Sequence, residues 1–206
     1  MDPIAVIDFE TTGLSPAQNA RATEIGVVIV EDGVIVSRYQ SLMNSGAHVP
    51  AFIEQLTGIS NAMLRDAPPA AQVMHEVADF VGDIPLVAHN AAFDQKFWDA
   101  ELGLIRRTRR QSFACSLLLA RRLLPQAPSH KLGNLNRWAG LPSTGTAHRA
   151  MADAEMAANL MGFMGAVLRE HHGIGQVSHE LLCGLQKVPA AKIAQALARI
   201  RQAAAC

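Results

Sequence analysis

The chain has 206 residues, the length of one domain or of one domain with a helical appendage. Half of the residues are hydrophobic, which permits a sizeable core and excludes a disordered chain. Eighteen basic residues balance eighteen acidic ones, so attraction to nucleic acid through bulk positive charge is not indicated. Three widely spaced cysteines form no metal-ligand pattern or disulfide framework, and no signal peptide or bilayer-length apolar stretch is recognisable. We therefore expect a cytoplasmic protein that does not contact a membrane.

The first strands are predicted to form an antiparallel meander. Residues 4–9 are an apolar run, residues 24–30 are rich in β-branched side chains, and residues 34–42 return after a turn. The turn contains Asp32 and Gly33, a pair that readily adopts the positive φ angles of a hairpin.

Helices and short strands are expected to alternate through the rest of the chain, which indicates an α/β domain. Short strands are expected at residues 86–88 and 112–115. Helical periodicity is visible at residues 73–81, 93–104, 116–124 and 131–138, in a long helix from near Arg149, and in two helices within 176–206. Apolar side chains share one side of three of these helices: Val73, Val77, Phe80 and Val81; Phe93, Phe97, Ala100 and Leu104; and Ile193, Leu197 and Ile200.

Acidic residues stand where a buried strand ends. Asp8 and Glu10 point to the same face by the two-residue period of a strand, and each raises the pKa of the other. For an isolated pair, two solvated acids at a strand end are the simpler interpretation. Asp94 and Asp153 lie in the first turns of predicted helices, where acids are common because they stabilise the helix dipole, and His148 precedes the second helix.

Together, the four carboxylates and the histidine predict a metal site. Such a cluster needs cations, and two divalent ions would balance its four negative charges. Oxygen ligands favour Mg²⁺ or Mn²⁺ over zinc, and paired metals about 4 Å apart are typical of phosphodiester hydrolysis.

Three segments, in order, resemble the motifs of the DEDDh 3′–5′ exonucleases. They are residues 7–14 (IDFETTGL), 89–94 (HNAAFD) and 147–154 (AHRAMADA). The resemblance extends over residues 1 to about 170 and is greatest to the proofreading type, which is similar to the DNA polymerase III epsilon subunit. It implies a ribonuclease H-like three-layer α/β fold with a mixed five-stranded sheet over residues 1–172. Residues 173–206 would then be a C-terminal helical appendage.

The resemblance also implies roles for the five clustered residues. Asp8, Glu10 and Asp153 would hold one metal ion, while Asp8 and Asp94 would hold a second. His148 would be the general base that takes a proton from the attacking water, which suits a histidine at neutral pH. The product would be a nucleoside 5′-monophosphate.

Substrate contacts are implied for the residues around the first two motifs. The backbone from Thr11 through Thr12 and Gly13 to Leu14 would contact the 3′-terminal nucleotide, and Asn90 belongs to the second motif. Leu14 corresponds to a wedge between the last two bases, although ordinary packing is equally compatible with the sequence. Phe93 is either part of the base pocket or part of the core. Thr57 stands where epsilon subunits often carry a histidine.

Basic residues offer further contacts. The run Arg106, Arg107, Arg109 and Arg110, and the pair Arg121 and Arg122, are candidates for phosphate binding or for solvated surface. Lys131 opens a short helix and is a candidate for facing the cleft.

The predicted function is metal-dependent 3′–5′ exonuclease activity on single-stranded or frayed DNA. The alternatives are an exoribonuclease that trims RNA 3′ ends and an accessory subunit of a DNA polymerase. The stripe Ile193, Leu197 and Ile200 is expected to pack on the domain, with a homodimer seam as the alternative.

Overall fold

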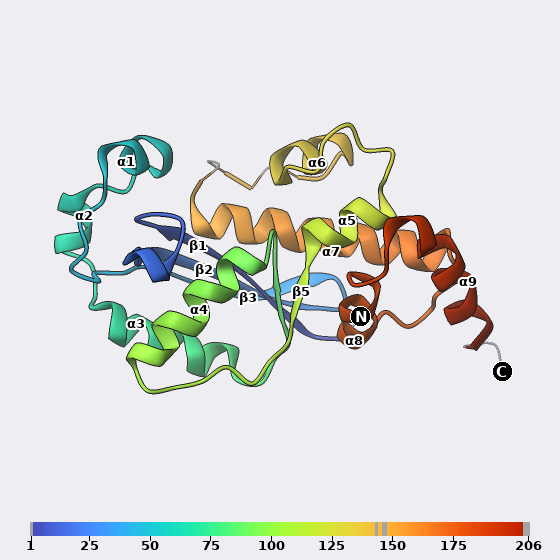
Figure 1. The fold of residues 1–206 in the computed structure, drawn as a ribbon, viewed down its shortest axis with the longest axis horizontal. Coiled ribbons are helices and arrows are strands. Elements are labelled where there is room, and N and C mark those ends of the chain that lie inside the picture. Colours follow the sequence, from blue (N-terminus) through green and yellow to red (C-terminus); the bar gives the residue numbers. More distant parts are fainter. Residues whose placement is uncertain (1, 143, 146–147, 204–206) are drawn as a thin grey trace.

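The computed structural model describes residues 2–142, 144–145 and 148–203 (Figure 1). Its sheet has the strand order β3-β2-β1-β4-β5, in which β1, β2 and β3 are antiparallel and β4 and β5 run parallel to β1. The strands are β1 Ile4–Thr11, β2 Ala22–Glu31, β3 Val34–Leu42, β4 Leu86–Ala88 and β5 Phe113–Cys115. The predicted meander and the two short strands are therefore confirmed, and β1 continues two residues beyond the predicted end.

Helices connect the strands and cover both faces of the sheet (Figure 1). The α-helices are α1 Ala51–Thr57, α2 Asn61–Arg65, α3 Ala70–Val81, α4 Ala92–Leu104, α5 Ser116–Leu123, α6 Leu132–Trp138, α7 Ala150–Glu170, α8 His179–Leu185 and α9 Ile193–Ala203. Two 3₁₀ turns lie at Pro16–Gln18 and Ala190–Lys192. Among the described helices, none combines the length and hydropathy that a transmembrane span requires.

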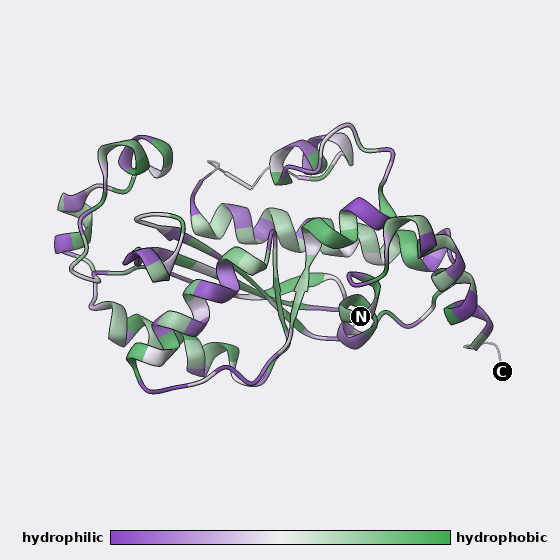
Figure 2. Cartoon of the chain, in the orientation of Figure 1, coloured by the Kyte–Doolittle hydropathy of each residue, from purple (hydrophilic) through white to green (hydrophobic). Residues whose placement is uncertain are grey.

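The alternation of side chains along β1 divides the core into two layers. Ile4 and Val6 pack on the side of α7, whereas Ala5, Ile7 and Phe9 pack on the side of α3 and α4. The apolar strands between these layers are visible at the centre of Figure 2. Because Asp8 and Glu10 continue the row of Ile4 and Val6, the same alternation turns both acids toward α7. The predicted three-layer fold is thus observed.

The C-terminal helices pack on the core layer beside α7. Leu182, Leu185 and Leu197 are buried there, with Ile193 and Ile200 partly buried against them. This arrangement confirms the prediction that the stripe of α9 packs on the domain.

The Gln186 side chain pairs with the free edge of β5. Its Oε1 accepts a hydrogen bond from the Cys115 N–H at 2.6 Å, and its Nε2 donates to the Phe113 carbonyl at 3.0 Å. The amide thus replaces a neighbouring strand at the sheet edge.

The predicted domain boundary between residues 172 and 173 stays a prediction.

Two features differ from the sequence expectations. Helices α1 and α2 were not predicted, because each is too short to show a helical period. The buried side of α4 is centred on Phe97, Trp98 and Leu102, whereas Leu104, expected beside Phe97, is 63% exposed.

Candidate active site

The site is formed where the ends of three elements meet. Asp8 lies on β1 directly opposite Gly26 of β2, and the first turn of α7 crosses β2 at that glycine. A Cβ atom on Gly26 would lie 2.4 Å from the Ala150 carbonyl carbon and 2.4 Å from the Met151 nitrogen. Only glycine therefore allows α7 to approach this closely, and the approach brings Asp153 to the acids of β1.

Asp94 reaches the site from the first turn of α4. It is 2% exposed, and its Oδ1 accepts a hydrogen bond from the Phe9 N–H at 3.1 Å. Phe9 lies between Asp8 and Glu10 in the strand, so this bond fixes the Asp94 carboxylate beside both acids.

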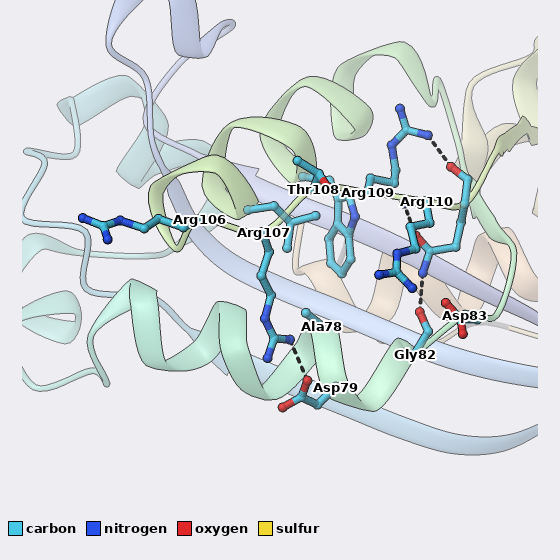
Figure 3. Close-up of a pocket in the computed structure, with 12 residues that line it drawn as sticks. Ala78, Asp79, Gly82, Asp83, Arg106, Arg107, Thr108, Arg109 and Arg110 are labelled. Atoms are coloured by element: carbon cyan, nitrogen blue, oxygen red, sulfur yellow. Dashed lines mark hydrogen bonds and ion pairs between the residues drawn. The ribbon is translucent and has the colours of Figure 1, made fainter.

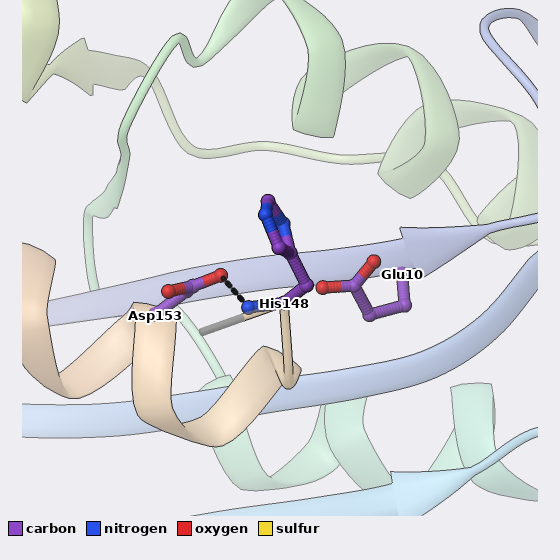
Figure 4. A group of neighbouring side chains, drawn as sticks. All are labelled: Glu10, His148 and Asp153. Carbon is purple, nitrogen blue, oxygen red and sulfur yellow. Dashed lines mark hydrogen bonds between the residues drawn. The ribbon is translucent and has the colours of Figure 1, made fainter. Parts of the chain in front are cut away.

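Glu10, His148 and Asp153 form a group of potential metal ligands (Figure 4). One ligand atom from each residue lies within 4.8 Å of the others. The His148 backbone N–H donates to Asp153 Oδ2 at 3.1 Å. His148 has a φ of 61°, an unusual left-handed conformation for a side chain of this size, and its imidazole is exposed. Asp153 thus holds the backbone that presents the histidine.

The acids are held in a state that favours their protonated forms. Burial raises the pKa of Asp8 well above its ordinary value, and Asp94, Asp153 and Glu10 raise it further by repulsion. Burial, followed by repulsion from Asp153 and Glu24, raises the pKa of Glu10 to about 8. The pKa of Asp94 is likewise raised by burial to about 8, and that of Asp153 is raised by burial. The interpretation of Asp8 and Glu10 as solvated strand-end acids is wrong for these reasons.

Sequence reasoning missed Glu24, which supports the site from behind. This residue is 1% exposed and accepts hydrogen bonds from Arg149 Nη2 at 2.8 Å, from Gln40 Nε2 at 2.8 Å and from the Ala150 N–H at 3.1 Å. Burial opposes ionisation of Glu24, but the bonds from Arg149, Gln40 and Ala150 outweigh it and lower the pKa. The available signal was an acid inside the β-branched run of β2.

The threonines of the first motif shape the turn that follows β1. Both side chains are buried: Thr11 Oγ1 donates to the Gly13 carbonyl at 2.7 Å, and Thr12 Oγ1 accepts from the Arg21 N–H at 3.0 Å. Leu14 projects from this turn and is 78% exposed, so the interpretation of Leu14 as a packing residue is wrong.

The other predicted substrate contacts divide between surface and packing. Asn90 is exposed in a left-handed conformation between β4 and α4. Phe93 is partly buried, with its ring centroid 5.0 Å from that of Phe97, so it contributes to the core. Thr57 is buried at the end of α1, where its Oγ1 donates to the Ile53 carbonyl and accepts from the Ile59 N–H.

A pocket of about 590 Å³ opens beside the acids. Asp8, His148 and Asp153 line it together with residues of α6. His89 also lines the pocket, where burial lowers the pKa of its imidazole to about 4. Its Nε2 faces the His130 carbonyl at 3.2 Å and its Nδ1 faces Ser116 Oγ at 2.9 Å. Because a carbonyl only accepts, neutral His89 carries its proton on Nε2.

The basic run after α4 lines a different pocket, of about 470 Å³ (Figure 3). Arg107 pairs with Asp79 at 2.6 Å, and Arg109 pairs with Asp99 at 2.7 Å and stacks over Phe113. Arg122 donates to the Val188 and Leu118 carbonyls. These three arginines therefore hold the fold together, which leaves Arg106 and Arg110 as the exposed members of the run.

The strand order, with helices on both faces and acids at the end of the central strand, defines a nuclease of the ribonuclease H-like class. The RNase_T family model, described as "Exonuclease", matches residues 5–161, and the chain belongs to this family. The prediction of a DEDDh exonuclease similar to the epsilon subunit is thereby confirmed.

Individual relatives agree with this assignment. The chain is 33% identical over 171 residues to the DNA polymerase III subunit epsilon of Aquifex aeolicus, covering 82% of this chain and 84% of that protein. It is 34% identical over 176 residues to the PolC-type DNA polymerase III of Clostridium perfringens, covering 85% of this chain but only 12% of the polymerase. A solved structure of Exonuclease X in complex with 5′ overhanging duplex DNA superposes with a TM-score of 0.69 at 25% identity, covering 89% of this chain and 99% of that one.

Proposed function

We propose that this protein is a divalent-metal-dependent 3′–5′ exonuclease that removes nucleoside 5′-monophosphates from single-stranded or frayed DNA ends. The observation that carries the proposal is the group of Glu10, His148 and Asp153, with Asp8 and Asp94 beside it, next to a pocket that Asp8, His148 and Asp153 line. Family membership and the polymerase and DNA-complex relatives support the same activity.

The residues present fit divalent cations. Four carboxylates with raised pKa values supply hard oxygen ligands whose mutual repulsion a cation removes. Asp8, Glu10 and Asp153 would hold one ion, and Asp8 with Asp94 would hold a second. When bound, two Mg²⁺ or Mn²⁺ ions would supply charge neutralisation and acidify the attacking water.

The chain itself supplies a base and a grip on the terminal nucleotide. In the proposed hydrolysis a water oxygen bonds to the phosphorus of the last linkage and the bond from phosphorus to the 3′ oxygen breaks. The 3′ oxygen takes a proton from solvent, so the shortened strand leaves with a 3′-hydroxyl. An imidazole nitrogen of His148 accepts the proton of that water. The turn from Thr11 to Leu14 holds the terminal nucleotide, with the exposed Leu14 side chain placed against its base. Asn90 and Phe93 remain predicted members of the same subsite.

The test is digestion of 3′-labelled single-stranded DNA, duplex DNA and RNA with Mg²⁺, with Mn²⁺ or with EDTA, using the full chain and Asp8→Asn. We expect metal-dependent mononucleotide release, fastest from single-stranded DNA, and its loss in the variant. Faster digestion of RNA would replace DNA by RNA as the substrate class. No release from any of these substrates would refute the proposed function.

We further propose a DNA polymerase as partner, because the Aquifex aeolicus relative is a polymerase subunit. Light scattering of the full chain, alone and with a polymerase catalytic subunit, tests this partner and the alternative homodimer together. A monomer that also fails to join the polymerase would reject both.

A further inference from the structure

Helix α6 forms one wall of the 590 Å³ pocket that Asp8 and Asp153 also line. The helix is held on α7 by its underside, where Leu135 is fully buried and Asn136 is 4% exposed (Figure 1). Lys131, Asn134 and Arg137 follow one another at intervals of three residues on the exposed side, and all three line the pocket. Two cations of α6 thus face the pocket that contains Asp8 and Asp153.

Within the described part of the chain, these two cations lack the ion pairs that several other arginines form. Arg107, Arg109 and Arg149 each pair with a carboxylate within 3 Å. Within residues 2–142, 144–145 and 148–203, neither Lys131 nor Arg137 forms an ion pair. Arg137 Nη1 instead donates to Asn134 Oδ1 at 3.3 Å, which holds the guanidinium along the helix. Both charges are therefore available to an anion that enters the pocket.

Asn136 provides a second, independent indication of a ligand. Its Nδ2 donates to the Leu132 carbonyl at 3.1 Å, but its Oδ1 is buried without a hydrogen-bond partner among the described residues. Leaving a buried acceptor unpaired is unfavourable, so a donor is expected to meet it. Asn136 lines the same pocket, where a nucleotide offers amino and hydroxyl donors.

We propose that Lys131 and Arg137 form a phosphodiester subsite that binds the substrate backbone upstream of the scissile linkage. This inference rests on the proposed exonuclease function and deepens it. The scissile phosphate belongs at the acids, so a strand that continues across the pocket places its next phosphates against α6. Arginine and lysine bind such phosphates without reading the base, which suits an enzyme that removes nucleotides one after another.

The experiment compares Lys131→Gln/Arg137→Gln with a matched control, Lys192→Gln/Arg199→Gln. The control removes the same two charges from exposed positions that do not line the pocket. We expect the α6 variant to raise KM for single-stranded DNA about tenfold or more with little change in kcat, because charged hydrogen bonds to bound substrate are lost. The salt dependence of log(kcat/KM) should become shallower by about 1.4, at about 0.7 per phosphate contact on a single strand. The control should match the wild type in both quantities.

A second measurement changes the substrate instead of the enzyme, and its wild-type part does not depend on the variant folding. Single neutral methylphosphonates are placed at the second, third and fourth linkages from the 3′ end. We expect at least one of them to raise KM for the wild type and the control but not for the α6 variant.

The failures of the two proposals are distinguishable. Inactivity of the wild type on every substrate refutes the exonuclease proposal. An active wild type whose KM and salt dependence are the same in the α6 variant and in the control overturns the subsite. An α6 variant that loses kcat at unchanged KM also overturns it.

Discussion

Filling both proposed cation sites is expected to release about two protons at pH 7. The pKa values of Glu10 and Asp94 are each raised to about 8, so at pH 7 each carboxyl is about 90% protonated. A carboxylate must lose its proton to ligate a metal, so each group releases about 0.9 proton when the cation binds. Asp8 shifts in the same direction and adds to the total. Affinity for Mn²⁺ should therefore rise up to about a hundredfold between pH 6 and pH 7 and level off above about pH 9.

Titration calorimetry measures this proton count directly. Mn²⁺ is added to the metal-free protein at pH 7 in buffers that differ in ionisation enthalpy, and the slope of the observed enthalpy gives the number of protons released. Glu10→Gln should release about one proton fewer, because one titrating ligand is gone. Glu170→Gln, an exposed acid at the end of α7, should match the wild type. Release of fewer than about half a proton, or an affinity that does not change between pH 6 and 8, would refute the reasoning from burial.

Three other outcomes are expected. A carboxyl whose pKa is higher in the folded than in the unfolded chain holds its proton more tightly when folded. The metal-free protein should therefore lose thermal stability as pH rises from about 4.5 to about 8. A melting temperature, measured by calorimetry, that rises over this window would contradict this expectation. Gly26→Ala should lower the free energy of unfolding, measured by urea titration, by about 3 kcal/mol, since the new methyl meets the backbone of α7. In the control Gly133→Ala the new methyl lies in open space, and this free energy should change little. Gln186→Ala should cost about 1–3 kcal/mol and speed amide exchange in β5, and unchanged exchange would exclude an edge role.

The sequence could predict those features that depend on neighbouring residues. Strands β1 and β2 of the meander are visible because buried strands require long apolar runs, and the Asp32-Gly33 turn is visible because few residue pairs adopt its φ angles. The clustered acids were predictable for a related reason. A carboxylate at the end of an apolar run conflicts with burial, and such conflicts concentrate at functional sites.

What the sequence could not show depends on contacts between distant segments. Gly26 is an ordinary glycine in a strand until α7, more than a hundred residues later, packs against it. Leu104 shares a helical period with Phe97, but it is the last residue of α4 and its side chain is exposed. The pocket beside the acids is lined by the short helix α6 and by acids from β1 and α7, and no local sequence pattern relates these side chains.

Glu10 and Glu24 show how the same residue type acquires opposite states. They lie directly opposite each other on β1 and β2, where like charges destabilise a sheet. Hydrogen bonds from Arg149 and the Ala150 N–H lower the pKa of Glu24. For Glu10, burial and repulsion outweigh the weaker attraction of Arg149, and its pKa is raised to about 8. The fold therefore supplies an internal cation to one glutamate and leaves the other to a cation from solution. This asymmetry separates the structural acid from the proposed metal ligand, although both stand in strands of similar sequence.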